Sequence, residues 1–273
     1  MTRNAGRPVA VCFFGITRSL THTIASIEKN VLAPAREQGQ VKVYAHFFQQ
    51  EEIENPRSGE KGALDQTEHR LLAPDWLQME EPDTCLARWD FEGLKRYGDY
   101  HYWNDDFRSA RNLVHQLHSL HKVTEAMLAD GAERCLFCRP DLRYHDSLAR
   151  PIRTALRARG DLVQVPYWQP WHALNDRFAV VLGRAAIAAY GQRIRLAHQF
   201  CAAGPRPLHS EQLLKYAIDA AGLPVHTIAA RASRVRMDGT QVVEDFNYPG
   251  SVEFRRKYRV DINPLIRLIK GGV

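Results

Sequence analysis

The chain has 273 residues, of which 45% are hydrophobic and 25% are charged, and its formal net charge is +6. This composition is typical of a globular protein and excludes an intrinsically disordered chain. The positive charge is spread along the sequence without a dense basic block, which favours anionic ligands such as nucleotides over a nucleic-acid-binding arm.

The first predicted elements alternate between strand and helix. Residues 7–15 form a buried strand that ends at Gly15, residues 21–35 have helical spacing of apolar side chains, and residues 40–48 form a second strand. This order is typical of an α/β unit with a parallel sheet. Residues 49–81 are polar and interrupted by proline and glycine, which predicts loops and a short helix.

The clearest helix spans residues 107–130. Its apolar stripe consists of Leu113, Leu117, Leu120 and Met127. A polar row lies beside this stripe and consists of Asn112, Gln116 and Ser119. The row has two interpretations, a surface that faces a bound ligand and a helix face in contact with solvent.

The later elements continue the alternation of strands and helices. They are a strand from residue 134, a helix over 147–160, a strand over 161–166, a polar turn followed by a strand and a helix within 167–194, a helix over 210–222 and a strand over 224–230. We therefore expect a single α/β domain over residues 1–273, with a mostly parallel central sheet flanked by helices.

The end of the chain, from about residue 251, is basic and amphipathic. It has two interpretations, a segment that lies on a membrane surface and a tail that packs against the domain. The start of the chain passes directly into a strand, and no apolar run reaches the ~20 residues that span a bilayer. These features predict a cytoplasmic protein, and in the first interpretation of the tail it contacts the inner membrane surface.

Two patterns suggest metal binding but do not have suitable geometry. Cys135 and Cys138 form a C-x-x-C pair inside a predicted strand, where their side chains point to opposite faces, so we expect them to be packing residues. His115, His118 and His121 recur at every third residue of a helix. Residues at this spacing rotate progressively around the helix axis, so the three imidazole rings do not easily converge on one ion.

Candidate binding residues follow the ends of predicted strands, where ligands of open α/β sheets bind. They are Gly15, Arg18, Arg139, Asp141 and the turn Asn175-Asp176-Arg177. Neither a Walker loop nor a G-x-G-x-x-G fingerprint is present. This pattern suits a pyrophosphate held by basic side chains or through Mg²⁺ or Mn²⁺, with Asp141 as the metal ligand. In the alternative interpretation, Arg139 and Asp141 only form an ion pair that caps the strand.

Several segments together resemble a known family. They are "FFGITRSL", "VKVYAHFF", "ARNLVHQLHSLHKV", "FCRPDLRY", "NDRFAV" and "HSEQLLKYAI". In this order they resemble bacterial glycosyltransferase-like proteins of surface-polysaccharide (capsule or lipopolysaccharide) gene clusters, which have the GT-A nucleotide-diphospho-sugar transferase fold. The resemblance covers roughly residues 9–228.

The resemblance implies a sugar nucleotide as donor and a glycan or glycolipid as acceptor. It implies that Gly15 and Arg18 line the nucleotide pocket, that Asn175 contacts the sugar or the acceptor, and that Arg139-Pro140-Asp141 stands where such enzymes carry an Asp-x-Asp metal motif. This chain departs from that motif because Arg139 replaces the first carboxylate. A cationic side chain beside the phosphates can partly replace a divalent ion, so the need for a metal stays open.

Transfer to an acceptor hydroxyl requires a carboxylate that takes up its proton. The candidates are Asp176 and Glu211, and the sequence favours Asp176 because the aromatic segment 167–172 beside it offers a surface for sugar stacking. Both residues also have structural interpretations, Asp176 as a turn residue and Glu211 as a favourable charge at a helix start. The alternative function is a non-catalytic module of the same fold that binds a glycan or nucleotide.

Overall fold

The computed structural model describes residues 8–55, 58–101, 103–171 and 173–247. The tail predicted from residue 251 lies outside these described residues. The strands are β1 (Val9–Gly15), β2 (Val41–Phe48), β3 (Glu52–Asn55), β4 (Glu60–Ala63), β5 (Trp76–Glu80), β6 (Arg134–Cys138), β7 (Leu142–Tyr144), β8 (Leu162–Pro166), β9 (Ala179–Leu182), β10 (Val225–Ile228) and β11 (Ala232–Arg234).

The longest helix is α5 (Arg108–Ala129), close to the predicted range. The other α-helices are α1 (Leu20–Ile27), α2 (Ala33–Arg36), α3 (Thr84–Arg88), α4 (Phe91–Lys95), α6 (Ala149–Arg157), α7 (Arg184–Gly191), α8 (Ala197–Ala202) and α9 (Ser210–Ala220). A π-helical turn, Glu28–Leu32, joins α1 to α2, and 3-10 turns occupy Glu68–Leu72 and Arg193–Leu196. None of the described helices is both long and apolar enough to cross a bilayer.

The central sheet has seven strands in the order β10-β8-β9-β6-β1-β2-β5. Every neighbouring pair is parallel except those that include β9, which is antiparallel to both β6 and β8. The predicted α/β class with a mostly parallel sheet is therefore confirmed. Because β9 runs in the opposite direction, its first residue lies at the edge where the parallel strands end. The turn before β9 thus reaches the same edge as the ends of β1 and β6.

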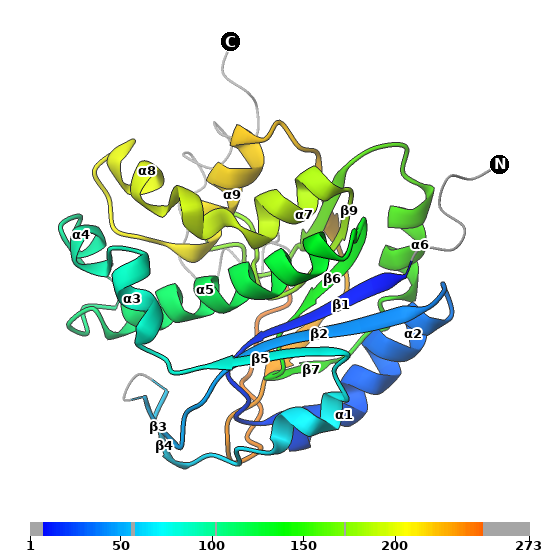
Figure 1. The fold of residues 1–273 in the computed structure, drawn as a ribbon, viewed down its shortest axis with the longest axis horizontal. Coiled ribbons are helices and arrows are strands. Elements are labelled where there is room, and N and C mark those ends of the chain that lie inside the picture. The colour runs from blue at the N-terminus through cyan, green and yellow to red at the C-terminus, as the bar shows by residue number, and fades with distance from the viewer. Residues whose placement is uncertain (1–7, 56–57, 102, 172, 248–273) are drawn as a thin grey trace.

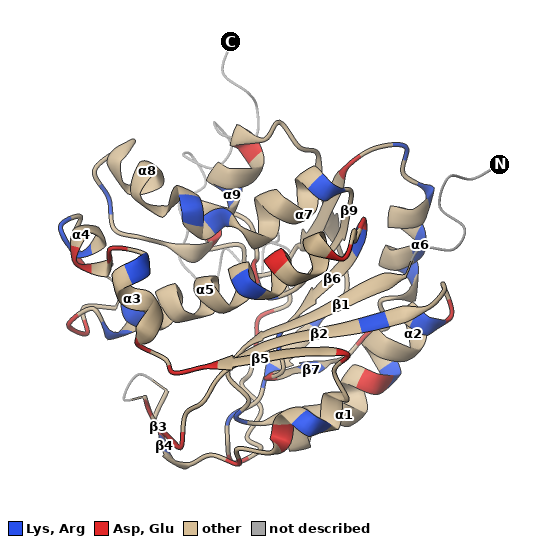
Figure 2. Ribbon diagram, viewed as in Figure 1, with Lys and Arg blue, Asp and Glu red and all other residues tan. Residues whose placement is uncertain are grey.

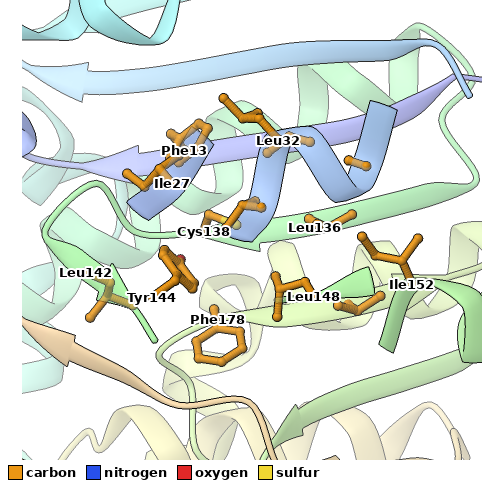
Figure 3. Close-up of a cluster of buried hydrophobic side chains, with 14 of the residues drawn as sticks. Phe13, Ile27, Leu32, Leu136, Cys138, Leu142, Tyr144, Leu148, Ile152 and Phe178 are labelled. Atoms are coloured by element: carbon orange, nitrogen blue, oxygen red, sulfur yellow. The ribbon is translucent and has the colours of Figure 1, made fainter. Parts of the chain in front are cut away.

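Helices cover both faces of this sheet (Figure 1). The α1–α2 segment and α6 pack on one face, and α5, α7 and α9 pack on the other. Strand β1 supplies alternate side chains to the two cores, with Phe13 in the first and Phe14 in the second, as expected for period-2 geometry. Figure 3 shows the first core, in which Phe13, Ile27 and Tyr144 pack between the sheet and the helices.

The cysteine prediction is confirmed. Cys138 lies in the first core and Cys135 in the second, so the C-x-x-C pair points to opposite faces of β6. All five cysteines are buried and free. Figure 2 shows that most of the central sheet carries no charged residues, whereas Lys, Arg, Asp and Glu lie mainly on helices and loops.

The structure corrects the prediction of loops and a short helix over residues 49–81. This region contains the β3–β4 hairpin and the edge strand β5 as well as a 3-10 turn. Strand β5 pairs on only one side and its residues are half-buried or exposed, so its sequence has no clear alternation of apolar side chains. The antiparallel ribbon of β7 and β11 was also not predicted, because its strands have only three residues each.

The contact between α7 and α5 provides a stability test. A Cβ atom on Gly191 would lie 2.0 Å from Thr124 Oγ1, so Gly191→Ala should force the two helices apart. We expect a loss of about 1–3 kcal/mol in the free energy of unfolding, measured by urea denaturation. Gly204→Ala is the control, since a Cβ atom there would meet nothing within 4 Å. An unchanged urea midpoint for Gly191→Ala would contradict this packing.

Candidate active site

The turn that follows β6 carries Asp141 and is held in place by two distant segments. Thr23 Oγ1 donates a hydrogen bond to Pro140 O at 2.6 Å, and the amide of Val235 donates to Asp141 O at 2.8 Å. Strand β7 begins directly after the turn and pairs with β11. These contacts fix the position of the Asp141 side chain, which is only 3% exposed.

Two arginines share the Asp141 carboxylate. Arg139 donates through Nε to Oδ1 at 2.9 Å and through Nη2 to Oδ2 at 2.7 Å, while Arg18 donates through Nη2 to Oδ2 at 2.7 Å. Burial alone would raise the pKa of Asp141, but the guanidinium groups of Arg139 and Arg18 outweigh it and hold that pKa well below its usual range. Asp141 is therefore a charged anchor for both arginines.

These residues belong to a larger set of charges, which we call the arginine network. Its arginines are Arg18, Arg139, Arg177, Arg193, Arg234 and Arg236, and its carboxylates are Glu60, Asp141, Asp176 and Glu244. Three of the carboxylates each pair with two arginines: Glu60 with Arg18 and Arg236, Asp141 with Arg18 and Arg139, and Glu244 with Arg177 and Arg234.

Arg177 brings the parts of the network within electrostatic range of one another. Burial lowers the pKa of Arg177 to about 10, and repulsion from Arg234 and Arg139 contributes to this shift. The nearest carboxylate oxygen of Glu244 is 3.6 Å away and is also paired with Arg234 at 2.8 Å. Arg177 therefore shares its Glu244 counterion with Arg234.

The two catalytic candidates, Asp176 and Glu211, interact electrostatically beside this network. Asp176 is buried, and one of its carboxylate oxygens accepts hydrogen bonds from Ser210 Oγ and, at 3.3 Å, from Arg193. The Glu211 side chain is 16% exposed and lies 3.3 Å from His209 Nδ1. Burial and the Asp176 carboxylate raise the pKa of Glu211 to about 8, so its protonation changes near neutral pH.

The Asn175 side chain stabilises the turn before β9 through hydrogen bonds to the backbone. Its Nδ2 donates to Trp168 O, and its Oδ1 accepts from the Arg177 amide at 2.9 Å. Trp168 is fully buried, so the prediction that segment 167–172 is a surface for sugar stacking is wrong for this residue. Gln169 and Trp171 have positive φ angles of 43° and 35°, a strained conformation for bulky side chains that is enriched at functional sites.

The polar row of α5 faces the same edge of the sheet for part of its length. Ser119 Oγ accepts a hydrogen bond from the Gly15 amide at 2.8 Å, and Gln116 Oε1 accepts from Arg139 at 3.2 Å. Asn112, one turn further toward the helix start, is exposed. Gly15 has a φ of 108°, and a Cβ atom there would meet nothing within 4 Å, so the backbone at the end of β1 borders open space.

A second group of polar side chains, on the other side of Ser119, has the composition of a metal site. His46, Glu80 and His118 offer ligand atoms that all lie within 4.8 Å of one another. The indole N–H of Trp89 donates to His118 Nδ1 at 2.9 Å, so a neutral His118 carries its proton on Nε2, 2.8 Å from Glu80. Burial lowers the pKa of His118, and Lys122 Nζ lies 3.8 Å from Glu80. A metal would have to displace the contact between His118 and Glu80, whereas His46 Nε2 is buried without a hydrogen-bond partner, 3.5 Å from Glu80.

Five members of the arginine network were not identified as site residues from the sequence. They are Glu60, Arg193, Arg234, Arg236 and Glu244. The signal that could have found two of them is the alternation of Arg234 and Arg236 in "SRVRM", because alternate residues of an extended segment share one face. The others come from a short hairpin, a 3-10 turn and an irregular segment, for which the sequence has no comparable pattern.

No protein-family model matches the sequence, and a search of curated proteins finds no match. Among solved structures, the chain is similar to the apo form of mouse xyloside xylosyltransferase 1, with a TM-score of 0.44 and 9% sequence identity, over 81% of this chain and 84% of that chain. A likeness at this level does not transfer an activity from one protein to the other.

Proposed function

We propose that the protein is a glycosyltransferase that moves a sugar from a nucleoside-diphosphate donor to a surface-polysaccharide or glycolipid acceptor. The observation that carries the proposal is the arginine network at the carboxyl edge of the sheet, beside Glu211 with its raised pKa. Ligands of open α/β sheets bind at this edge. The mostly parallel order of the strands is compatible with the GT-A fold that the sequence resembles.

The donor would bind with its diphosphate against the arginines. Guanidinium groups present paired N–H donors that match phosphate oxygens, and Arg18 and Arg139 are both held rigidly by Asp141. The open backbone at Gly15 and the partly exposed Gln116 would border the nucleoside or the sugar. Asn112 lies further along the same row of α5 and would contact the donor only at the periphery.

In this proposal Glu211 is the general base. The acceptor hydroxyl oxygen bonds to the anomeric carbon, the bond from that carbon to the phosphate oxygen breaks, and its electron pair leaves with the nucleoside diphosphate. The hydroxyl proton passes to Glu211, whose pKa of about 8 makes it a stronger base than an ordinary carboxylate. Asp176 is held by Arg193 and Ser210 and acts through its charge on Glu211, so we now favour Glu211 over Asp176.

Nucleoside diphosphates should stabilise the protein. A ligand at 100 times its dissociation constant adds about 2.7 kcal/mol, which corresponds to a rise in Tm of roughly 5–10 °C for a chain of this size. Thermal denaturation with UDP, GDP, CDP and ADP, against the matching nucleosides as controls, measures this effect. Unchanged Tm values with every nucleoside diphosphate and nucleotide sugar, both with and without Mn²⁺, would refute the proposal.

The same screen, combined with a turnover assay, distinguishes a glycosyltransferase from the alternative, a non-catalytic binding module. A non-catalytic module of this fold would bind the nucleotide but would neither hydrolyse a nucleotide sugar nor transfer its glycosyl group. The presence of Arg139 in place of the first carboxylate of the metal motif is the observation that favours this alternative. The choice between the two functions depends on whether the arginines can stabilise the leaving diphosphate as a divalent cation would.

A further inference from the structure

The residues around Asp141 do not fit a divalent cation. Magnesium and manganese bind to carboxylate oxygens whose lone pairs and negative charge are available. Both oxygens of Asp141 already accept hydrogen bonds from guanidinium groups, and Arg139 occupies the place of the other carboxylate of the expected motif. A third cation beside Arg18 and Arg139 would be repelled by both.

The arginine network has an excess of positive charge, which favours a diphosphate. Its six arginines share four carboxylates, so the network carries two more positive than negative charges, and one more when the neighbouring Glu211 is ionised. Like charges that share counterions repel one another, and a bound anion relieves this cost. The diphosphate of a sugar nucleotide carries two negative charges, one on each phosphate.

The network also retains hydrogen-bond donors for this anion. Arg139 donates through Nε, Nη1 and Nη2, and each of its terminal nitrogens has a second hydrogen. The Arg139 side chain is 19% exposed, which leaves part of the guanidinium group accessible. The Nε atom of Arg18 is buried and has no hydrogen-bond partner, although both of its terminal nitrogens are paired.

From these contacts we infer that the site binds the diphosphate of its donor through Arg139 and Arg18, without a divalent cation. Asp141 is then a positioning residue that holds the two guanidinium groups side by side. This inference rests on the proposed function and adds to it that the leaving nucleoside diphosphate is stabilised by fixed side chains. Because arginine remains charged at all physiological pH values, such a site keeps its positive charge without a metal and can bind the anion at any of them.

The test measures the Kd of UDP, GDP, CDP and ADP for the full chain by calorimetry, first in EDTA and then in Mn²⁺. For the nucleotide that binds, the two Kd values of the wild-type protein should agree within about threefold, since the ion contributes little to binding. Arg139→Asp restores the paired carboxylates of the metal motif. This variant should lose about tenfold or more in affinity in EDTA and recover it in Mn²⁺.

Two further variants complete the design. Arg139→Gln removes the charge without adding a carboxylate, so its affinity should fall about tenfold or more in both buffers and Mn²⁺ should not restore it. Arg195→Asp is the matched charge control, because Arg195 is 55% exposed and pairs with Glu125 outside the network. It should leave both Kd values unchanged.

The outcomes separate this inference from the proposed function. A wild-type Kd that improves more than about tenfold on addition of Mn²⁺ overturns the inference and leaves the glycosyltransferase proposal intact. Absence of binding by every nucleotide in both buffers overturns both. If Arg139→Asp does not fold, the wild-type comparison and Arg139→Gln still decide the question.

Discussion

Replacing Glu211 with Gln should reduce glycosyl transfer by about 10²–10⁴-fold while the Kd of the nucleoside diphosphate changes little. The amide keeps the shape of the side chain but cannot take up the acceptor proton. In the wild-type protein the rate should rise with pH until Glu211 loses its proton at about pH 8, because only the carboxylate acts as a base. Initial rates between pH 6 and 9, together with calorimetry of nucleotide binding, measure both effects.

The same substitution should stabilise the protein at high pH. The folded-state pKa of about 8 exceeds the unfolded value near 4.5, so in this range the folded state binds a proton that the unfolded state does not. Wild-type stability contributed by this group is therefore present at pH 4.5 and is lost as the pH rises to about 8. Glu211→Gln removes this loss, and its Tm should exceed that of the wild type by several degrees at pH 8–9.

Glu92→Gln is the control for this comparison, because Glu92 is exposed and pairs with Lys95 at the surface. Its Tm should follow that of the wild type at every pH. If the Tm difference between Glu211→Gln and the wild type does not change with pH, Glu211 does not have a raised pKa. Retained transfer activity in Glu211→Gln would instead show that another group is the base, and Asp176 would be tested next.

Replacing Asp141 with Asn should have the largest effect on stability. The substitution keeps the shape of the side chain but leaves the half-buried guanidinium groups of Arg18 and Arg139 without their shared, buried counterion. Loss of one partner of a buried ion pair costs about 3–5 kcal/mol, which corresponds to a fall in Tm of roughly 6–20 °C. Calorimetry of thermal unfolding at pH 7 measures the change.

The effect of Asp141→Asn depends on pH in a definite direction. The pKa of Asp141 is well below its usual range in the folded state, so its contribution to stability is present above about pH 4 and declines only under more acidic conditions. Asp219→Asn is the matched control, since the Lys215–Asp219 pair is exposed and should contribute less than about 1 kcal/mol. Equal Tm values for both variants would mean that Asp141 is not a buried anchor.

Much of the fold could be predicted from the sequence because the spacing of apolar residues within a short segment indicates a helix or a strand and its buried face. The apolar stripe of Leu113, Leu117 and Leu120 predicts α5 to within one residue at each end, since burial of one helix face requires that spacing. The alternation in residues 134–138 predicts that Cys135 and Cys138 point to different cores, as they do. The sequence likewise predicts that Arg139 and Asp141 lie at the carboxyl edge of a buried strand.

The assembly of the site was decided by tertiary structure alone. Asp141 is shared between Arg139, two residues away, and Arg18, which comes from the end of another strand. Arg236 reaches Glu60 from a segment near the end of the described chain. Trp168 is a core residue although its neighbours suggested a sugar surface, and the pKa of Glu211 depends on its burial and on Asp176. Periodicity records which face of an element is buried, whereas the charge balance of a site depends on which distant segments the fold brings together.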